Sequence, residues 1–428
     1  MHIHPGAAEP GGRGVRVLHT ADWHIGQTLA GFARDHEHEN VLAAIEDICV
    51  EREVDALIVA GDIFDHQNPS GASQQLYYRT LLALRRACPR MTIVITAGNH
   101  DAAGRLEAPA AILGELGVHV FGNARRIDGR LDARRHLVPL PAPGGEVGAH
   151  VLAVSYPTPA CLPPFGALAT ENGMSSIVEA TRTLYSEMWE RSGAGRDGLP
   201  VIVTGHLHVV GAIESEGSER RILVGGQHAV PTSIFLEDAA YVALGHLHKA
   251  QRIGAESIRY SGSLFPLSAT EAGYKHSVTL VTLDGDNTPQ IEEIALPRPV
   301  EFIRLPRLTI GDLGDHLKRL DLDEGLPGER QPFVQVQISR EGLGPGLQGQ
   351  IEEIVSKFPV RLVGISRERA EADGDTPASQ DTTPTDRLQD LQPLEMFRDA
   401  FKEKHSVAPS ETHERVFHEV LAAAATEE

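Results

Sequence analysis

Five short apolar segments of the sequence each lead into side chains that can bind a metal ion or move a proton. The segments are rich in Val, Ile and Leu, which is typical of buried strands, and in four of them a glycine stands directly before the polar residues. Carboxylate, imidazole and amide groups in this mixture suit borderline divalent ions such as Mn²⁺. The polar residues at these segment ends are Asp22, His24, Asp62, Asp65, Asn99, His100, Asp101, His206, His246 and His248.

The elements that must position these residues alternate between strands and helices. This alternation indicates a largely parallel sheet with helices on its faces, and ligands bind beyond the carboxyl ends of such strands. We therefore expect the polar groups to meet at one edge. They outnumber the ligands of one ion, and two ions that share a carboxylate are the arrangement that cleaves phosphate esters. The first predicted strands are 15–19, 56–60, 92–96 and 118–121, and the first predicted helices are 35–51, 73–87 and 106–116.

The alternation of predicted strands and helices continues as far as Pro297-Arg298-Pro299, where it ends. Before these prolines we expect strands at 150–155, 201–204, 221–224 and 241–244, a helix at 176–190, and a closing hairpin of 278–283 with 291–294. A small α+β unit follows them. Its predicted elements are 302–305, 311–320, 333–338, 349–357 and 360–365.

The composition narrows the class of protein. There are 39 Lys and Arg against 59 Asp and Glu, and the net charge of −20 disfavours a protein that holds nucleic acid through a basic face alone. The three cysteines are widely spaced, which predicts small buried side chains in a reducing compartment. No apolar run reaches the roughly 18 residues of a membrane span, and the N-terminus lacks the apolar core of a secretion signal. We therefore expect a cytoplasmic protein.

The series DxH, GDxxD, GNHD, GH and GHxH resembles the signature of the calcineurin-like metallophosphoesterases. The longer stretches TADWHIGQ, GDIFDHQNPS, AGNHD and ALGHLHK resemble the branch that contains the bacterial SbcD nucleases of DNA double-strand-break repair. The resemblance covers most of the chain and is weaker after the prolines. It implies an α/β fold, a metallophosphoesterase sandwich of mixed, largely parallel sheets flanked by helices. It also implies a small α+β capping domain and C-terminal partner-binding helices.

The resemblance and the composition together divide the chain into five parts. A disordered arm, 1–14, precedes the nuclease domain, 15–297, and a capping domain that positions DNA, 300–366. An acidic flexible linker, 367–388, leads to a helical segment, 389–426, that would bind an SbcC-type ATPase subunit. The implied activity is that of a metal-dependent exonuclease on double-stranded DNA ends and an endonuclease on hairpins and single strands. Its implied setting is DNA repair, recombination and replication, in association with the nucleoid.

The resemblance also implies roles for the residues at the strand ends. Two divalent ions are expected, with Mn²⁺ as the preferred ion and Mg²⁺ as the alternative. The first ion would take Asp22, His24 and His248, the second would take Asn99, His206 and His246, and Asp62 would bridge them.

Three neighbours of these ligands would support the reaction. His100 would act on the substrate phosphate or protonate the leaving 3′ oxygen, because the pKa of imidazole suits a general acid. Asp101 would orient His100 or cap the following helix. Asp65 would hold the site from behind the ligands.

A few basic and histidine residues near the motifs have two interpretations each. Each can be a DNA-phosphate contact or an ordinary surface charge. These residues are His66, Arg105 and Lys249, and beside them Arg34, Arg79 and Lys275. His208 repeats the spacing of His248 and is left open as a ligand or substrate contact. His38 is expected on the surface of the predicted helix 35–51.

Other functions and assemblies stay open at this point. A metallophosphoesterase that acts on nucleotides or other small phosphoesters would share the motifs, but it would not need the region after Pro299. A scaffold without catalysis would have lost ligands, and here every position of the pattern is filled. A homodimer through the nuclease domain is a further open alternative.

Overall fold

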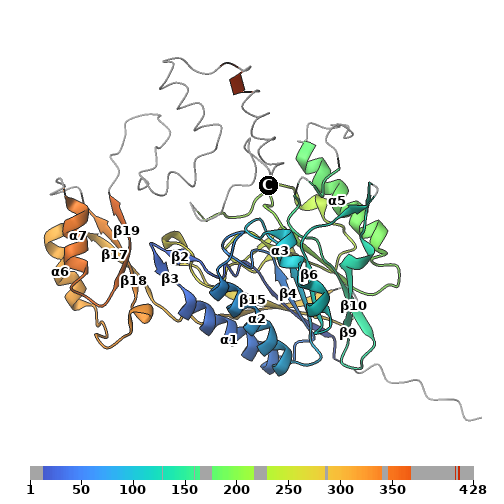
Figure 1. Cartoon of the computed structure of the whole chain (residues 1–428), viewed down its shortest axis with the longest axis horizontal. Helices are drawn as coiled ribbons and strands as arrows, with labels where there is room; N and C mark the ends of the chain where they lie inside the picture. The colour runs from blue at the N-terminus through green and yellow to red at the C-terminus, as the bar shows by residue number, and fades with distance from the viewer. Residues whose placement is uncertain are drawn as a thin grey trace, which may run out of the picture. The chain divides into compact units, whose positions relative to one another are not determined.

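The computed structural model describes residues 13–127, 129–158, 160–163, 176–215, 229–284, 288–339 and 346–367, together with 410 and 413–414. Figure 1 shows these parts as ribbons. Four of the expectations from sequence lie wholly or almost wholly outside the described residues. They are the arm 1–14, the strand 221–224, the linker 367–388 and the helical segment 389–426.

Two six-stranded sheets form the framework of the larger part of the chain (Figure 1). The first has the order β16 (Pro289–Ala295), β15 (Ser277–Leu283), β1 (Val15–Thr20), β4 (Ala56–Ala60), β5 (Thr92–Thr96) and β6 (Val118–Phe121). The second has the order β13 (Gln251–Ile253), β14 (Ala255–Tyr260), β12 (Tyr241–Gly245), β11 (Val201–His206), β10 (Val147–Leu152) and β9 (Leu137–Pro141). In each sheet four neighbouring strands are parallel, and antiparallel strands complete the edges. The mixed, largely parallel sandwich expected from the sequence is therefore confirmed.

The side chains of β4 contribute to two different hydrophobic cores, one on each face of the strand. Leu57 and Val59 pack into the core that the first sheet shares with its helices. Ala56, Ile58 and Ala60 face the opposite way, into the core between the two sheets. Successive side chains of a strand point to opposite faces, so a continuous apolar run is what a strand buried on both sides requires.

Helices cover the outer face of each sheet (Figure 1). The helices α1 (Asp35–Glu51) and α2 (Gly71–Ala87) pack on the first sheet, and the side chain of Ser70 caps α2 by accepting from the Ser73 N–H. The helix α5 (Ser176–Ser192) packs on the second sheet. Two short hairpins lie in the connections, β2 (Thr28–Leu29) with β3 (Phe32–Ala33), and β7 (Arg126–Ile127) with β8 (Arg130–Leu131).

The prediction of a single helix at 106–116 is wrong. The structure has two short helices there, α3 (Ala103–Glu107) and α4 (Ala110–Gly114). Pro109 lies between them, and proline cannot continue a helix because it lacks the N–H and its ring clashes with the preceding turn.

The small unit after the prolines has its own sheet and core. Its three strands are all parallel, in the order β17 (Phe302–Leu308), β18 (Phe333–Ile338) and β19 (Arg361–Arg367). The helices α6 (Ile310–Arg319) and α7 (Leu347–Val355) pack on this sheet through an apolar cluster that includes Leu313, Val336 and Ile351. We call this unit the cap.

Two further observations concern the described part of the chain. No helix in it is long and apolar enough to cross a membrane. Cys49 and Cys161 are buried and Cys88 is half-buried, and all three are free thiols.

Candidate metal centre

The seven expected ligands lie at the carboxyl ends of five strands that belong to both sheets. Strands β1, β4 and β5 of the first sheet and β11 and β12 of the second lead directly into them or end on them. Parallel strands bring their carboxyl ends to one edge, which explains why residues far apart in sequence meet here. The seven residues are Asp22, His24, Asp62, Asn99, His206, His246 and His248, and all except Asn99 are buried.

Two glycines permit this close approach of the backbone. A Cβ atom on Gly98 would lie 2.1 Å from Oδ1 of Asp62, and one on Gly245 would lie 1.9 Å from the carbonyl oxygen of Ala60. Both distances are far shorter than the closest approach of a carbon and an oxygen atom that are not bonded to each other. Glycine before the polar residue is therefore a steric requirement of the site.

Four of the expected ligands have left-handed backbone conformations. The φ angles are 51° at Asp22, 46° at His24, 50° at Asp62 and 102° at His246. Hydrogen bonds between neighbouring turns support them: the Asp22 N–H donates to the Gly61 carbonyl at 3.0 Å and the His24 N–H to the Asp62 carbonyl at 3.0 Å. Such conformations cost about 1–3 kcal/mol each and are concentrated at functional sites.

The first group of ligand atoms comes from Asp22, His24 and His248, whose candidate donor atoms lie within 4.8 Å of one another. Each imidazole is held by a carboxylate behind it. His24 Nδ1 is 3.1 Å from Oδ1 of Asp65, and His248 Nδ1 is 2.9 Å from Oε1 of Glu271. Carboxylates in this position fix the tautomer and ring orientation of a metal-ligating histidine.

The second group comes from Asp62, His206 and His246, also within 4.8 Å of one another. Oδ1 of Asn99 lies 3.0 Å from His206 Nε2 and 3.1 Å from His246 Nδ1. The other nitrogen of His206, Nδ1, is 2.9 Å from the carbonyl oxygen of Ala60 and donates to it.

Asp62 stands between the two groups. Its Oδ2 is 3.6 Å from His24 Nε2 and 3.3 Å from His206 Nε2, and its Oδ1 accepts a 2.8 Å hydrogen bond from the His100 N–H. Burial would raise the pKa of Asp62, but the charge and hydrogen bond of His206, with His100 and His24, hold it well below its usual range. Asp62 is therefore a carboxylate, as a bridging ligand must be.

His206 balances the negative charge of Asp62 in the metal-free chain. Burial would lower its pKa, but the charge and hydrogen bond of Asp62, with the charge of Asp22, raise it to about 9. The pKa of His246 goes the other way, well below its usual value, because of burial and the neighbouring His206. A proton on His206 thus occupies the position where a cation is favourable.

The donor set fits divalent ions. His24 Nδ1 faces the Asp65 carboxylate and carries the ring proton, so Nε2 presents a lone pair toward the Asp62 carboxylate. This Nε2 is buried and has no hydrogen-bond partner. A lone pair and a carboxylate oxygen facing each other in a buried place are unfavourable unless a cation lies between them. Imidazole nitrogens, carboxylates and one amide oxygen are ligands that suit Mn²⁺-type ions.

Comparisons with known proteins agree with this geometry. A family model described as calcineurin-like phosphoesterase matches residues 15–250, and one described as Type 5 capsule protein repressor C-terminal domain matches residues 297–405. A relative from Rhodobacter capsulatus, named as the D component of the nuclease SbcCD, is 43% identical over 90% of this chain and 94% of its own length. This chain belongs to the SbcD family of calcineurin-like phosphoesterases.

Other SbcD relatives are more distant. Proteins of the same name are 30% identical in Escherichia coli K12, over 83% of this chain and 86% of the relative, and 36% identical in Bacillus subtilis, over 66% and 70%. Among solved structures, TT1561 of Thermus thermophilus has a TM-score of 0.34 at 14% identity, covering 66% of this chain and 99% of its own. A dimetal phosphatase from Danio rerio has a TM-score of 0.35 at 10% identity, covering 66% and 96%. Membership in this family implies divalent metal ions.

His100 lies at the edge of the SbcD-type site, 7% exposed. Its Nδ1 is 2.7 Å from the Asp65 carbonyl oxygen, which places the proton of the neutral ring on Nδ1. Its ring meets that of His24 edge-on, with centroids 4.7 Å apart. His24, Asp62 and His100 also bring donor atoms within 4.8 Å of one another, so distance alone leaves His100 able to contact an ion or a phosphate bound there.

Asp101 holds the turns of the site together. Its carboxylate accepts hydrogen bonds from the N–H groups of Gly98 at 2.8 Å, Ile63 at 3.1 Å and Phe64 at 3.0 Å. Burial and the charge of Asp62 raise its pKa to about 6. The alternative that it caps the next helix is wrong, because α3 begins after Ala102 without a side-chain cap.

The three proposed DNA contacts of this SbcD-family chain differ in their surroundings. His66 has a 63% exposed side chain, 3.1 Å from Oδ2 of Asp65. Arg105 is exposed and donates to Asn68. Lys249 is half-buried, with its ammonium 5.6 Å from the centre of the Tyr274 ring.

Five other residues considered from the sequence also have defined places. Arg34 is 1% exposed, so it cannot reach DNA, and His38 is buried rather than on the surface. His38 Nε2 is 2.9 Å from the carbonyl oxygen of Trp23. Of the remaining two basic residues, Arg79 is exposed and pairs with Glu39, and Lys275 lines a pocket beside the loop that carries Glu271. His208 pairs with Glu214 at 3.2 Å and belongs to neither group of ligand atoms.

Glu271 was missed from the sequence. It is fully buried, and its contact with His248 closes the first group of ligands. No motif signals it, because it lies 23 residues after its partner in a loop.

Proposed function

We propose that this chain is the nuclease subunit of an SbcC–SbcD-type complex and that it hydrolyses DNA phosphodiester bonds with two divalent ions, of which Mn²⁺ fits best. The observation that carries the proposal is the convergence of seven donors from five strand ends, with Asp62 between them. The curated relatives are named as nucleases, which favours DNA as the substrate. The expected cleavage is exonucleolytic on double-stranded ends and endonucleolytic on hairpins and single strands.

In this proposal the ligands divide as the motifs predict. When bound, the two ions supply Lewis-acid activation of a water molecule and neutralise charge on the phosphate. Asp65 and Glu271 orient the imidazoles of His24 and His248 by accepting their Nδ1 protons. Oδ2 of Asp62 faces one imidazole of each group, 3.6 Å from His24 Nε2 and 3.3 Å from His206 Nε2.

His100 supplies the proton in the proposed reaction. Its Nδ1–H donates to the Asp65 carbonyl oxygen, so the protonated ring would deliver its second proton from Nε2. The leaving 3′ oxygen is a poor leaving group until it is protonated, which is where a general acid contributes most. Asp101 would support this step only indirectly, by fixing the turn that carries His100.

The proposal is tested with the purified full chain, Mn²⁺ and end-labelled DNA. Duplex, hairpin and single-stranded substrates are compared with p-nitrophenyl phosphate under the same conditions. Cleavage of DNA with little hydrolysis of the monoester is expected. Hydrolysis of the monoester or of nucleotides without any cleavage of DNA would instead identify a small-phosphoester enzyme and overturn the proposal.

The proposed DNA contacts are tested separately. Replacement of Arg105 or Lys249 by Gln should raise KM for duplex DNA and leave KM for a small phosphodiester unchanged, because each removes a phosphate contact away from the ligands. His66→Gln should do the same. An unchanged KM for DNA would assign these three residues to the ordinary surface.

The expected partner is an SbcC-type ATPase, bound through the segment 389–426. A chain ending at Thr385 should keep its thermal unfolding transition and its metal binding but should no longer co-purify with the ATPase. Co-purification of this shortened chain would locate the interface elsewhere. A homodimer through the nuclease domain would use exposed apolar residues such as Tyr78 and Leu82 of α2, and light scattering measures it directly.

A further inference from the structure

One loop contacts a proposed metal ligand. It runs from Leu264 to His276 and carries Glu271, and we call it the Glu271 loop. Oε1 of Glu271 is 2.9 Å from Nδ1 of His248, and Oε2 accepts from the N–H of Leu267 at 2.9 Å. The orientation of the His248 ring therefore depends on where this loop lies.

Arg34 fastens the Glu271 loop to the start of α1. Its Nη2 donates to the Pro266 carbonyl at 2.9 Å, and the guanidinium pairs with the buried carboxylate of Glu37. Its Nη1 donates to Gln27 at 3.1 Å, and Gln27 in turn donates to the Leu267 carbonyl at 3.0 Å. A buried guanidinium with this many partners is a fixed structural element.

The cap completes the surroundings of Arg34. The guanidinium carbon lies 4.6 Å from the ring centre of Phe265 in the loop and 4.8 Å from that of Phe333 in β18 of the cap. Arg304 of β17 also donates to the carbonyl oxygen of Ala269, two residues before Glu271. The cap thus contacts both the anchor of the loop and the loop itself.

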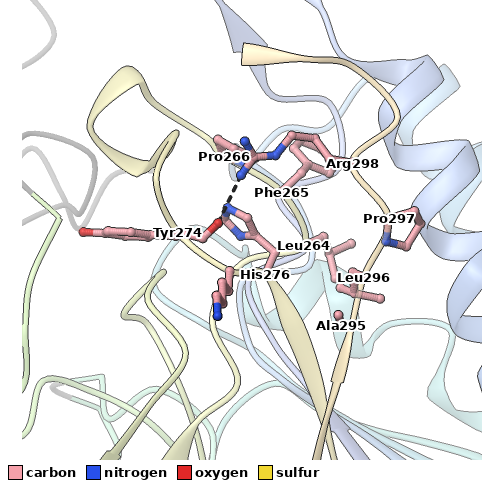
Figure 2. A pocket seen from close by; sticks show the side chains of 10 residues that line it. Leu264, Phe265, Pro266, Tyr274, His276, Ala295, Leu296, Pro297 and Arg298 are labelled. Carbon is pink, nitrogen blue, oxygen red and sulfur yellow. Dashed lines mark hydrogen bonds between the residues drawn. The ribbon is translucent and has the colours of Figure 1, made fainter. Parts of the chain in front are cut away.

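A pocket borders the loop on another side. A pocket of about 240 Å³ lies against Leu264, Phe265 and Pro266 at one end of the loop and against Tyr274, Lys275 and His276 at the other (Figure 2). Arg298, in the segment that leads to the cap, donates to the Tyr274 carbonyl at 3.0 Å, as the dashed line in Figure 2 shows. A loop that borders an open space depends on its remaining contacts, and those include Arg34 and cap residues.

We propose that Arg34 and Phe333 are positioning residues that couple docking of the cap to metal binding by His248. Loss of the Phe333 ring would leave one face of the Arg34 guanidinium without its aromatic partner. The Glu271 loop would then be held less firmly, and Glu271 would orient His248 less well. Coupling is reciprocal, so an ion at this site would also favour the docked cap. The inference rests on the proposed assignment of Asp22, His24 and His248 to the first ion.

The test measures Mn²⁺ binding to the full chain by calorimetric titration. Asn99→Ala removes a ligand only from the second site and weakens it, so in that background the more tightly bound ion reports on the first. Adding Phe333→Leu should weaken this binding about three- to tenfold, less than the roughly 10–100-fold loss when an outer partner is removed outright. Arg34→Lys keeps the charge but cannot make the same fork of hydrogen bonds, and it should weaken binding in the same way.

A control on the same strand separates coupling from general damage to the cap. Val336, like Phe333, is fully buried in β18, but it packs against the cap helices. Val336→Ala should lower the unfolding temperature of the cap and leave Mn²⁺ affinity unchanged. Equal affinities in the Phe333→Leu and parent chains, or equal losses in Phe333→Leu and Val336→Ala, would overturn the coupling. Wild-type chain that binds no Mn²⁺ would overturn the metal assignment itself, and the coupling with it.

Discussion

Replacement of His100 by Ala separates metal binding from catalysis at this site. The imidazole Nδ1 lies 2.7 Å from the Asp65 carbonyl oxygen, and loss of this hydrogen bond should lower the free energy of unfolding by about 0.5–1.5 kcal/mol. A general acid contributes about 10²–10⁴-fold to rate. The expected loss in kcat on duplex DNA is therefore of that size, or about 3–5 kcal/mol of transition-state stabilisation.

The assay uses two substrates with different leaving groups. Duplex DNA releases a 3′ oxygen that must be protonated, whereas the p-nitrophenyl ester of thymidine 5′-phosphate releases a stable phenolate. His100→Ala should therefore lose most of its activity on DNA and little on the ester. Calorimetric titration should still find two bound Mn²⁺ ions per chain.

Two results would refute this reasoning. Loss of one Mn²⁺ from His100→Ala would make His100 a ligand, which the distances to His24 and Asp62 allow. Equal loss of activity on both substrates would replace the general acid with electrostatic stabilisation of the phosphate, because that role does not depend on the leaving group.

Three further predictions concern the ligands and their turns. Asp62→Ala should abolish binding of both ions and all cleavage, and retention of one tightly bound Mn²⁺ would contradict its bridging role. Gly98→Ala places a Cβ atom 2.1 Å from Oδ1 of Asp62 and should lower the unfolding free energy by about 1–3 kcal/mol and weaken Mn²⁺ binding. Its control, Gly104→Ala, meets no atom within 4 Å and should do neither. Because Asp62 raises the pKa of His206 to about 9, an ion must displace the proton there, so Mn²⁺ affinity should rise about tenfold per unit from pH 6 to 8 and level off above pH 9. Titration in two buffers of different ionisation enthalpy counts the released proton, and a count of zero at pH 7 would contradict displacement of a proton from His206 by the ion.

The positions of the proposed ligands were predictable because each lies directly after an apolar run. Strand type and the carboxyl-end rule are both local or topological properties, so Asp22, Asp62 and His206 could be placed at one edge without knowledge of any contact. The strands β4 and β5 have the predicted bounds, since an uninterrupted apolar run fits a strand buried on both faces.

The supporting residues could not be found in the same way. Arg34, Glu37 and His38 are polar residues at the start of a helix, a place where exposed charges are common. They are buried because residues far along the chain cover them, including Phe265 and Phe333. Glu271 likewise depends on a contact formed only in the folded chain. The sequence pattern indicates which residues can bind the ions. The tertiary packing that holds these residues in place leaves no local pattern in the sequence.

The left-handed backbone at Asp22, His24, Asp62 and His246 implies a conflict between folding and function. The backbone angles alone would favour glycine at these four positions, because glycine adopts such angles without strain. Each ligand is therefore retained at the expense of stability, by an amount on the order of 1 kcal/mol. Glycine in place of a ligand should therefore give an inactive chain in which relief of backbone strain offsets part of the stability lost with the side chain's own contacts, such as the hydrogen bond from the His100 N–H to Asp62. The positions most needed for activity are thus positions where the backbone itself is strained.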